Sequence, residues 1–349
     1  MKKSSALFII SLIALLLTAC KPSNPKKKKT SSSSGQVTTS ASVTPGSTSG
    51  EAPTSIVPGP TSSVIPTSGS KPVPPSTSYV PPEPHPAEGY EECDEAYNNH
   101  DKDGLLSALR SYTSQGQAGS YADLWETYKT VYIRADGKMF DYYSCITSFT
   151  PGKDQAGSYS EEGDVYNREH SIPKSWWGGA QSNQGADPYI VIPTDGWVNG
   201  MRSNFSFGMV KTIEKQSAQG FCKKGTSDPD WLVTDHTVFE PDDSVKGDLA
   251  RIYFYAIARY ANSYNWTQDD DASLCFTGKN DANFGFTDYA VKLLSYWSQL
   301  DPVSEWELTV SDRCAPIHGC RNPFVDHPEY ANVLWGHNSN YTPYTYSQN

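Results

Sequence analysis

The stretch "DVYNREHSIPKSWWGG", residues 164–179, places a glutamate directly beside a histidine and puts a proline three residues further on. Side chains that are adjacent on a regular strand point to opposite faces of the sheet. Glu169 and His170 can therefore share one site only where the strand bends or ends. Pro173 cannot donate a hydrogen bond to a central ladder, which predicts a strand end here. Catalytic residues are often placed at such corners, so this pair is a candidate site.

The N-terminus predicts export. Residues 1–19 begin with a positive head and continue with an apolar run from Ala6 to Leu17, which is the pattern of a signal peptide. The run ends in "LTAC", which resembles the lipobox of bacterial lipoproteins. This resemblance implies cleavage before Cys20, lipidation of its thiol and a position on the extracellular face of the cell membrane. The alternative is ordinary signal cleavage beside an unmodified cysteine.

Two further segments follow the signal peptide. Residues 20–88 are rich in Ser, Thr, Pro and Lys, and such a segment cannot bury enough apolar surface to offset its ordering entropy. We expect it to be a disordered tether that begins at the lipidated cysteine. Residues 89–349 show no internal repeat and no change in composition. Their number suits one large catalytic domain.

The charge of the chain limits its mode of binding. The net charge is −11, and the first 88 residues hold eight lysines and three glutamates, so the remainder has 20 basic and 36 acidic residues, or −16. A protein that holds nucleic acid through bulk electrostatics should be basic. The window 166–215 differs, with five basic and four acidic residues. A less acidic patch on an acidic body favours a metal-assisted enzyme over a high-affinity binder.

The cysteines also suggest an oxidising compartment. Of the seven in the chain, six remain after Cys20, an even number that predicts up to three disulfides. Cys314 and Cys320 could close a short loop, but the sequence does not assign the pairs. No two cysteines form a C-x-x-C, which argues against a zinc ribbon or a thioredoxin-like site.

Apolar periodicity predicts an α+β domain, mostly helical around a small sheet. The run at 188–193 is short, apolar and bounded by prolines, which is typical of a strand. The helix at 246–261 has the strongest amphipathic pattern. The predicted helices span 120–131 with Ser120 as the cap, 246–261, 287–302 and 327–336 with Pro328 at the start.

A second stretch, "PTDGWVNGMRSNFSFG" at 193–208, supplies Asn199, Arg202 and Asn204. Carboxylate and amide oxygens suit Mg²⁺ or Ca²⁺. A neutral imidazole can take a proton from water, and a guanidinium matches phosphate oxygens. Together these groups predict a phosphodiesterase site. Each group also has a structural alternative: the Glu-His pair by chance, a turn at Asn199, and a surface ion pair at Arg202.

Four blocks together resemble the bacterial endonuclease I family: "NREHSIPKSWWGG", "PTDGWVNGMRSNFSFG", "FEPDDSVKGDLARIYFYAIARY" and "CRNPFVDHPEYANVLWG". The likeness runs from about residue 121 to residue 336. Members of this family are secreted, sequence-nonspecific nucleases of the ββα-metal (His-Me finger) class. The resemblance therefore implies a ββα-metal core in which the Glu-His pair faces a metal-bearing helix.

The resemblance also implies a role for each matched residue. His170 aligns with the general base, while Glu169 and Asn199 align with the two ligands of one divalent metal. This metal is expected to be Mg²⁺, with Ca²⁺ or Mn²⁺ as alternatives. Arg202 is expected to be a catalytic group that acts on the phosphate.

Two more residues, Arg168 and Asn204, are expected to contact the substrate or support the site.

One departure from the family concerns the segment before "PTDG", where many relatives carry a histidine-containing "D-x-H-H/N" block. Here the sequence reads "DPYIVIPTDG". The core roles are intact, so we expect a working enzyme.

The expected activity is metal-dependent hydrolysis of phosphodiester bonds in DNA, RNA or both, leaving 5′-phosphate products. We expect a monomer that touches the membrane only through its lipid anchor. One alternative is a catalytically silent surface module that binds nucleic acid or wall polymer. Another is a surface enzyme that acts on a different phosphodiester such as teichoic acid.

Overall fold

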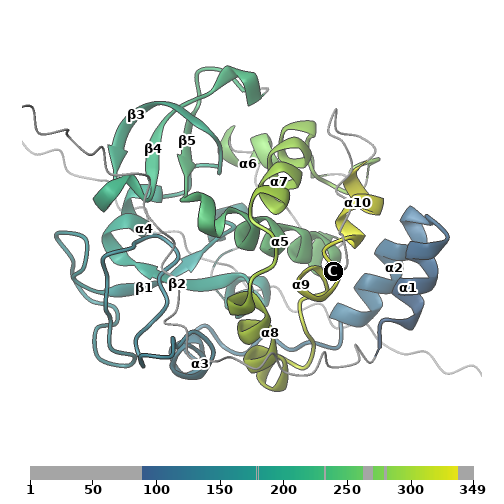
Figure 1. Ribbon diagram of the computed structural model, residues 1–349, viewed down its shortest axis with the longest axis horizontal. Coiled ribbons are helices and arrows are strands. Elements are labelled where there is room, and N and C mark those ends of the chain that lie inside the picture. Colours follow the sequence, from purple (N-terminus) through teal and green to yellow (C-terminus); the bar gives the residue numbers. More distant parts are fainter. Residues whose placement is uncertain are drawn as a thin grey trace, which may run out of the picture. The chain divides into compact units, whose positions relative to one another are not determined.

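The computed structural model describes residues 89–177, 179, 181–231, 233–261, 270–278 and 281–336 (Figure 1). The signal peptide, Cys20 and the tether lie outside these residues. Helices surround two small antiparallel sheets, which confirms the predicted α+β class. None of the helices in this described part has the length and apolar content that a membrane span requires.

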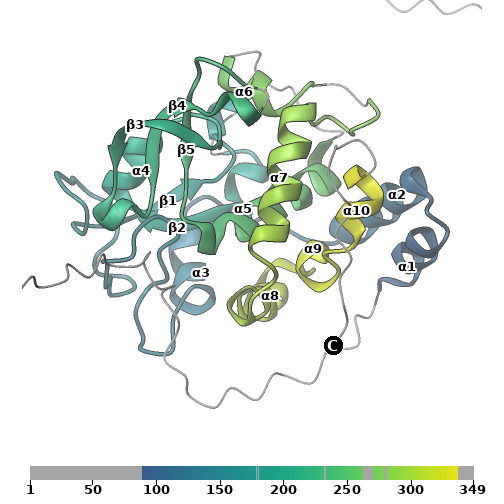
Figure 2. The same ribbon diagram turned by 45° about the horizontal axis from the view of Figure 1, so that its top comes forward.

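Helix α5 (Asp243–Tyr260) forms the centre of the fold, and 15 of its 18 residues are buried. It packs against α2 (Lys102–Thr113), α7 (Asp288–Leu300) and α9 (Pro323–Asp326), and both ribbon views show it crossing the middle of the helical region (Figures 1 and 2). The sequence predicts a helix here with one apolar face. The structure instead buries nearly the whole circumference, which is typical of a central helix.

Buried polar contacts fix α5 against its neighbours. The backbone nitrogen of Gly247 donates to Asp301 Oδ2 at 3.0 Å, and a Cβ at Gly247 would lie 1.8 Å from the Asp301 carbonyl oxygen. Only glycine permits this close approach. Arg251 donates from Nε and Nη2 to the two carboxylate oxygens of Glu307, each at 2.6 Å. This bidentate pair joins α5 to α8 (Glu305–His318).

The other helices confirm parts of the predicted pattern. The predicted helix at 287–302 corresponds to α7. The helix predicted from Ser120 begins later, as α3 (Leu124–Val131), because Ser120 and Asp123 hydrogen-bond to each other in a preceding turn. The segment predicted as one helix at 327–336 starts only at α10 (Tyr330–Trp335). Two further helices are α1 (Glu91–Asn98) and α6 (Asp270–Cys275).

The larger sheet has three strands in the order β3-β4-β5. They are β3 (Val210–Gln216), β4 (Lys223–Ser227) and β5 (Thr237–Glu240). The β3–β4 pairing has two register shifts, which bend the hairpin. Short 3-10 turns at Ala218–Gly220 and Pro229–Trp231 connect these strands.

The smaller sheet pairs β1 (Tyr166–His170) with β2 (Val191–Asp195), and β2 leads directly into α4 (Gly196–Arg202). Strand β1 ends at His170, as predicted, while β2 begins three residues later than the predicted strand at 188–193. The connection between β1 and β2 contains 3-10 turns at Lys174–Trp176 and Gln184–Ala186. In Figure 1, α4 lies between the two sheets.

Local chemistry sets both ends of α4. The Asp195 carboxylate accepts a hydrogen bond from the Val198 backbone nitrogen at 2.8 Å, so it caps the first turn. Ser203 ends the helix with a backbone φ of 54°. Residues other than glycine rarely adopt this left-handed conformation. Asn199 and Arg202 are three residues apart on this helix, so they share one of its faces.

The expectation of disulfides is wrong for this structure. All six cysteines of the described residues are free thiols, and five of them are buried. Cys320 shows the reason at its own position. Its sulfur lies 3.7 Å from the Thr113 carbonyl oxygen and 3.4 Å from His318 Nδ1, so polar groups of the core surround it. An even count of cysteines suggests a compartment, but it does not bring thiols within bonding distance.

Candidate active site

An open cleft of about 300 Å³ lies where the end of β1 meets α4. It brings together all six side chains that the sequence singled out for catalysis, metal binding or substrate contact. Its lining residues are Tyr121, Asn167, Arg168, Glu169, His170, Pro173, Lys174, Ser175, Asn199, Arg202, Ser203 and Asn204. The structure thus groups these residues from three separate segments of the chain. It does not by itself assign their roles.

Glu169 is almost fully buried in the wall of this cleft. Its Oε1 accepts hydrogen bonds from the Tyr143 hydroxyl and from Arg202 Nη1, both at 2.9 Å. Burial raises the pKa of Glu169 to about 7, while Arg202 and Tyr143 oppose that rise. Within the described residues, Oε2 accepts no hydrogen bond. One carboxylate oxygen is therefore fixed by the protein and the other is available to a ligand.

The hydrogen bonding of His170 defines its tautomer. Its Nε2 lies 3.1 Å from the carbonyl oxygen of Gly185, and a carbonyl can only accept, so Nε2 carries the proton. The lone pair of the neutral ring is then on Nδ1, to which no described residue donates. Burial, together with the nearby charges of Lys174 and Arg202, lowers the pKa of His170 to about 4, against the opposing effect of the Gly185 hydrogen bond. The imidazole is therefore neutral at pH 7 and able to accept a proton.

The ring of His170 is also held from one side. It stacks on Tyr121, with the ring centroids 5.4 Å apart and the planes inclined by 28°. The guanidinium of Arg168 lies 3.6 Å from the centroid of the same tyrosine and donates to its carbonyl oxygen at 2.7 Å. Tyr121 therefore links two of the predicted site residues through its ring.

Arg202 braces the site from inside the protein. Its side chain is 1% exposed. Besides Glu169, it donates from Nη1 to the His170 carbonyl at 2.8 Å and from Nη2 to the Ser171 carbonyl at 2.7 Å. These contacts fix the backbone at the end of β1. The sequence suggests that Arg202 acts on the phosphate, whereas its observed contacts are to the protein and support a positioning role.

The donor set fits a hard divalent cation. Glu169 offers one unbonded carboxylate oxygen, and Asn199 presents an amide to the same cleft from α4. Within the described residues, the cleft included, no group of three or more His, Cys, Asp or Glu side chains could hold a metal ion, so a site here depends on the amide of Asn199 beside Glu169. Two protein oxygens leave most of the coordination shell to water and substrate, which is common for Mg²⁺ in phosphoryl chemistry.

Three groups with direct contacts at the site escaped the sequence analysis. Gly185 acts through its backbone carbonyl, which has no sequence signature. Tyr143 and Tyr121 reach the site from 26 and 49 residues before Glu169 and His170, a distance over which periodicity carries no information. The one available signal is that the family likeness begins near Tyr121.

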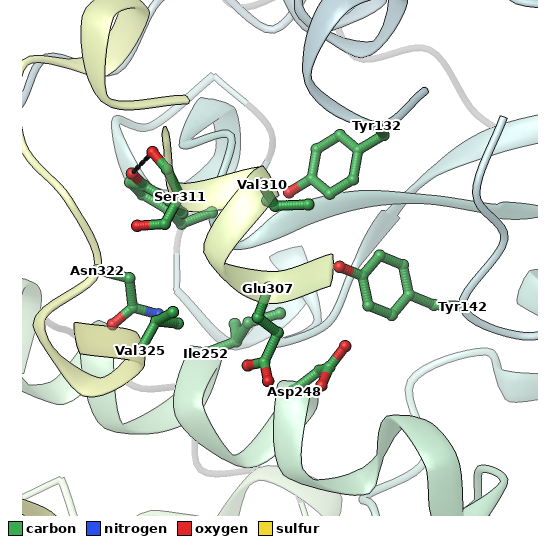
Figure 3. Close-up of a pocket in the computed structure, with 10 residues that line it drawn as sticks. Tyr132, Tyr142, Asp248, Ile252, Glu307, Val310, Ser311, Asn322 and Val325 are labelled. Atoms are coloured by element: carbon green, nitrogen blue, oxygen red, sulfur yellow. Dashed lines mark hydrogen bonds between the residues drawn. The ribbon is translucent and has the colours of Figure 1, made fainter. Parts of the chain in front are cut away.

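A smaller cavity of about 30 Å³ lies between α5 and α8 (Figure 3). The figure shows the carboxylates of Asp248 and Glu307 beside each other, below the tyrosines at 132 and 142. Burial and the neighbouring Glu307 raise the pKa of Asp248 well above its usual range. This space is of water size, so it belongs to the buried polar core rather than to a substrate site.

Comparisons with known proteins agree with the geometry of the cleft. A model of the family described as Endonuclease I matches residues 102–329, a range that contains the whole cleft. An extracellular ribonuclease of Bacillus subtilis (strain 168) is 29% identical over 259 residues, which cover 72% of this chain and 81% of that protein. An extracellular ribonuclease of Bacillus amyloliquefaciens is 30% identical over 236 residues, covering 66% and 73% respectively.

Proposed function

Since the chain belongs to the endonuclease I family and is a nuclease that hydrolyses phosphodiester bonds, we propose that it is a secreted, metal-dependent enzyme without sequence preference. The observation that carries this proposal is the pairing of His170 and Glu169 in one cleft, each with one unbonded acceptor atom. RNA is the first expected substrate, because the two relatives are named ribonucleases, and DNA is the second. The family assignment favours this enzyme over a silent binding module.

In this proposal β1, β2 and α4 form a ββα-metal core. Glu169 Oε2 and the Asn199 amide oxygen would hold one divalent ion, expected to be Mg²⁺. When bound, such an ion polarises the phosphate and neutralises the charge that develops on its oxygens. The two ligands come from β1 and α4, so their relative position depends on the packing of that helix against the strand.

His170 supplies the proton transfer. Nδ1 takes a proton from a water that attacks phosphorus in line with the departing 3′ oxygen. Water in the cleft protonates that oxygen as it leaves, and the product carries a 5′-phosphate. An anionic phosphate beside the ring favours the imidazolium, so substrate binding raises the low pKa of this base toward the working pH. Arg202 keeps the His170 backbone in place, and Tyr121 restricts rotation of the ring.

Two further polar side chains of the cleft are proposed to contact the substrate. Asn204 follows α4 directly, and Lys174 lies on the segment after β1; both line the opening. Arg168 is held against Tyr121, so it supports the ring stack beside the base. Contacts of this kind address the backbone rather than the bases, which is why no sequence preference is expected.

Cleavage products give the sharpest test of this mechanism. The purified chain is incubated with single-stranded RNA and with plasmid DNA, in Mg²⁺ and in EDTA. We expect cleavage only with the metal, and product ends that polynucleotide kinase labels only after phosphatase treatment. Cleavage in EDTA, or products with 5′-hydroxyl ends, would rule out the proposed chemistry.

Outside the described residues, we propose a signal peptide at 1–19, a lipid on Cys20 and a tether at 20–88 before the catalytic domain at 89–349. The support is the "LTAC" sequence and the Ser/Thr/Pro-rich composition, together with the extracellular relatives. We expect Cys20→Ala to move the protein from the membrane fraction to the medium. A protein that stays in the membrane fraction after this change is not anchored through Cys20.

A further inference from the structure

Strands β3 and β4 carry a concentration of positive charge on an otherwise acidic domain. Four lysines lie within residues 211–224, where the only acidic residue is Glu214. Residues 89–349 as a whole carry a net charge of −16, as derived above. The lysines are Lys211, Lys215, Lys223 and Lys224. None of these four lysines lines the cleft, so their positive charge calls for a separate explanation.

Two of these lysines form a defined surface, here called the lysine pair: Lys215 on β3 and Lys224 on β4. They are direct partners in the antiparallel ladder, so their side chains project from the same face of the sheet. Lys215 Nζ lies 4.1 Å from the ring centroid of Trp197, and Lys224 Nζ lies 4.9 Å from that of Phe205. Each ammonium is thus held over an aromatic face.

The lysine pair lies against the helix that supplies Asn199 to the cleft. Trp197 is on α4, two residues before the cleft residue Asn199, and Phe205 directly follows the cleft residue Asn204. The pair therefore borders both ends of the helix that supplies Asn199 to the site. Figures 1 and 2 agree with this placement, because the β3–β4 hairpin lies beside α4 in both views.

The charges of the pair are available to a ligand. Lys215 is exposed and, among the described residues, forms no ion pair. Lys224 has only Glu214, at 3.6 Å, and that carboxylate is half exposed. By contrast, Lys246 is buried between Glu240 and Asp243, at 2.7 and 2.6 Å. Ion pairs that solvent reaches, such as this half-exposed one at Lys224, contribute little and exchange readily for a stronger anion.

We propose that the lysine pair binds the phosphate backbone of the substrate strand outside the scissile phosphate. This inference rests on the proposed nuclease function, because it assigns a second contact for the same substrate. The rings hold the ammonium groups in place, so less side-chain freedom is lost when a phosphate binds. The body of the enzyme repels nucleic acid, which makes this edge the route by which a strand reaches α4.

The test compares a long substrate with a short one. The full chain and its Lys215→Gln/Lys224→Gln variant are assayed on a single-stranded RNA long enough to reach the pair, and on a dinucleotide. We expect a higher KM with unchanged kcat for the long strand, and no change for the dinucleotide. Loss of two phosphate contacts lowers the slope of log kcat/KM against log salt by about 1.4, or about sevenfold between roughly 50 and 200 mM salt.

Two matched variants separate this contact from general charge. Lys129→Gln/Lys153→Gln removes the same charge from exposed positions outside the β3–β4 hairpin and should leave the salt slope unchanged. Lys215→Arg/Lys224→Arg keeps the charge and should restore the KM. Equal loss in the Lys129/Lys153 variant would show that net charge alone is responsible and would overturn the assignment.

The remaining outcomes are also decisive. If the dinucleotide loses as much activity as the long strand, the pair acts on the cleft rather than on a distant phosphate. If neither substrate changes, the pair does not contact the strand. If the lysine-pair variant keeps its nucleic-acid KM but loses binding to vesicles that contain phosphatidylglycerol, the surface serves a membrane. A wild-type chain that cleaves neither substrate contradicts the proposed function instead.

Discussion

Two histidines of this protein are buried to a similar degree and are shifted in opposite directions. Burial lowers the pKa of His170 to about 4, whereas the pKa of His318 rises to about 10, because its carboxylate partner Asp187 outweighs the effect of burial. His170 has cationic neighbours and one nitrogen without a described partner. His318 lies 3.2 Å from Asp187 Oδ2 through Nε2, and its Nδ1 lies 3.4 Å from Cys320 Sγ.

The neighbours of a buried histidine decide whether its ring is charged or neutral at pH 7. Asp187 also accepts hydrogen bonds from the hydroxyls of Tyr255 and Tyr260, at 2.9 and 2.7 Å. Around His318 the polar atoms satisfy one another, which favours stability. At His170 one acceptor atom, Nδ1, has no partner among the described residues. The two regions are nevertheless connected through the chain. Gly185 accepts the hydrogen bond of His170, and Asp187, the partner of His318, follows only two residues later.

The largest expected effect is on activity at His170. His170→Ala removes the proposed base, so we expect cleavage to fall by about 10²–10⁴-fold, with the thermal midpoint of unfolding little changed. Initial rates on RNA, measured beside a melting curve, check this. His236→Ala, at a half-exposed histidine outside the cleft, is the matched control and should keep full activity. A His170→Ala protein with wild-type rates would remove the basis of the mechanism.

The second effect is on stability at the other histidine. Asp187→Asn leaves the charged His318 without its buried partner, so we expect the free energy of unfolding to fall by about 3 kcal/mol. Urea unfolding measures this. Glu126→Gln, which breaks an exposed pair with Lys129, should cost less than about 1 kcal/mol. Equal costs in the two variants would mean that the buried network adds no more than a surface pair.

The third prediction concerns pH. The pKa of His318 is raised on folding, so its stabilising contribution is fully present below the unfolded value, about 6.5, and is lost as the pH rises through about 10. The pKa of Asp187 is lowered mainly by His318 and Arg259, against its burial. Burial raises the pKa values of Tyr255 and Tyr260, so His318, rather than Asp187 or these two tyrosines, is expected to change charge between pH 7 and 10.

We therefore expect the free energy of unfolding of the wild type to decrease over that range more steeply than that of His318→Gln. Urea titrations of both proteins at several pH values test this, because the comparison cancels groups titrating elsewhere. Parallel pH dependences would contradict a raised pKa at His318.

The smallest effect is expected at the Glu169 side of the cleft. Tyr143→Phe removes one hydrogen bond to Glu169 Oε1 while the Arg202 bond remains. We expect a loss of about 1 kcal/mol in stability and a cleavage rate reduced by less than tenfold. Tyr289→Phe removes a comparable buried bond to the Phe207 carbonyl and should cost similar stability without changing the rate. Equal rates in both variants would show that Tyr143 does not tune the site.

The sequence predicts the parts of this molecule that depend on local patterns. The apolar spacing at 246–261 and 287–302 predicts α5 and α7, and Pro173 predicts the end of β1 at His170. The family likeness selects the residues that the cleft brings together. Each of these signals lies within a short stretch of chain.

What the sequence does not predict comes from long-range contacts. The tautomer of His170 depends on a backbone carbonyl 15 residues away, and the bracing role of Arg202 follows from its burial against the end of β1. Likewise, a cysteine count carries no distances between thiols, so the disulfide prediction failed. The opposite pKa shifts of the two histidines are set by neighbours that fold into place from distant segments.

The hydrogen bond from His170 to Gly185 also limits the direction in which the ring can release a proton. Because Nε2 is bonded to a group that cannot take a proton, a proton acquired on Nδ1 must leave by the side on which it arrived. That side opens into the cleft, where the cut strand still lies immediately after the reaction. In the proposed mechanism the base is reset through the cleft, so proton release and product release share one opening.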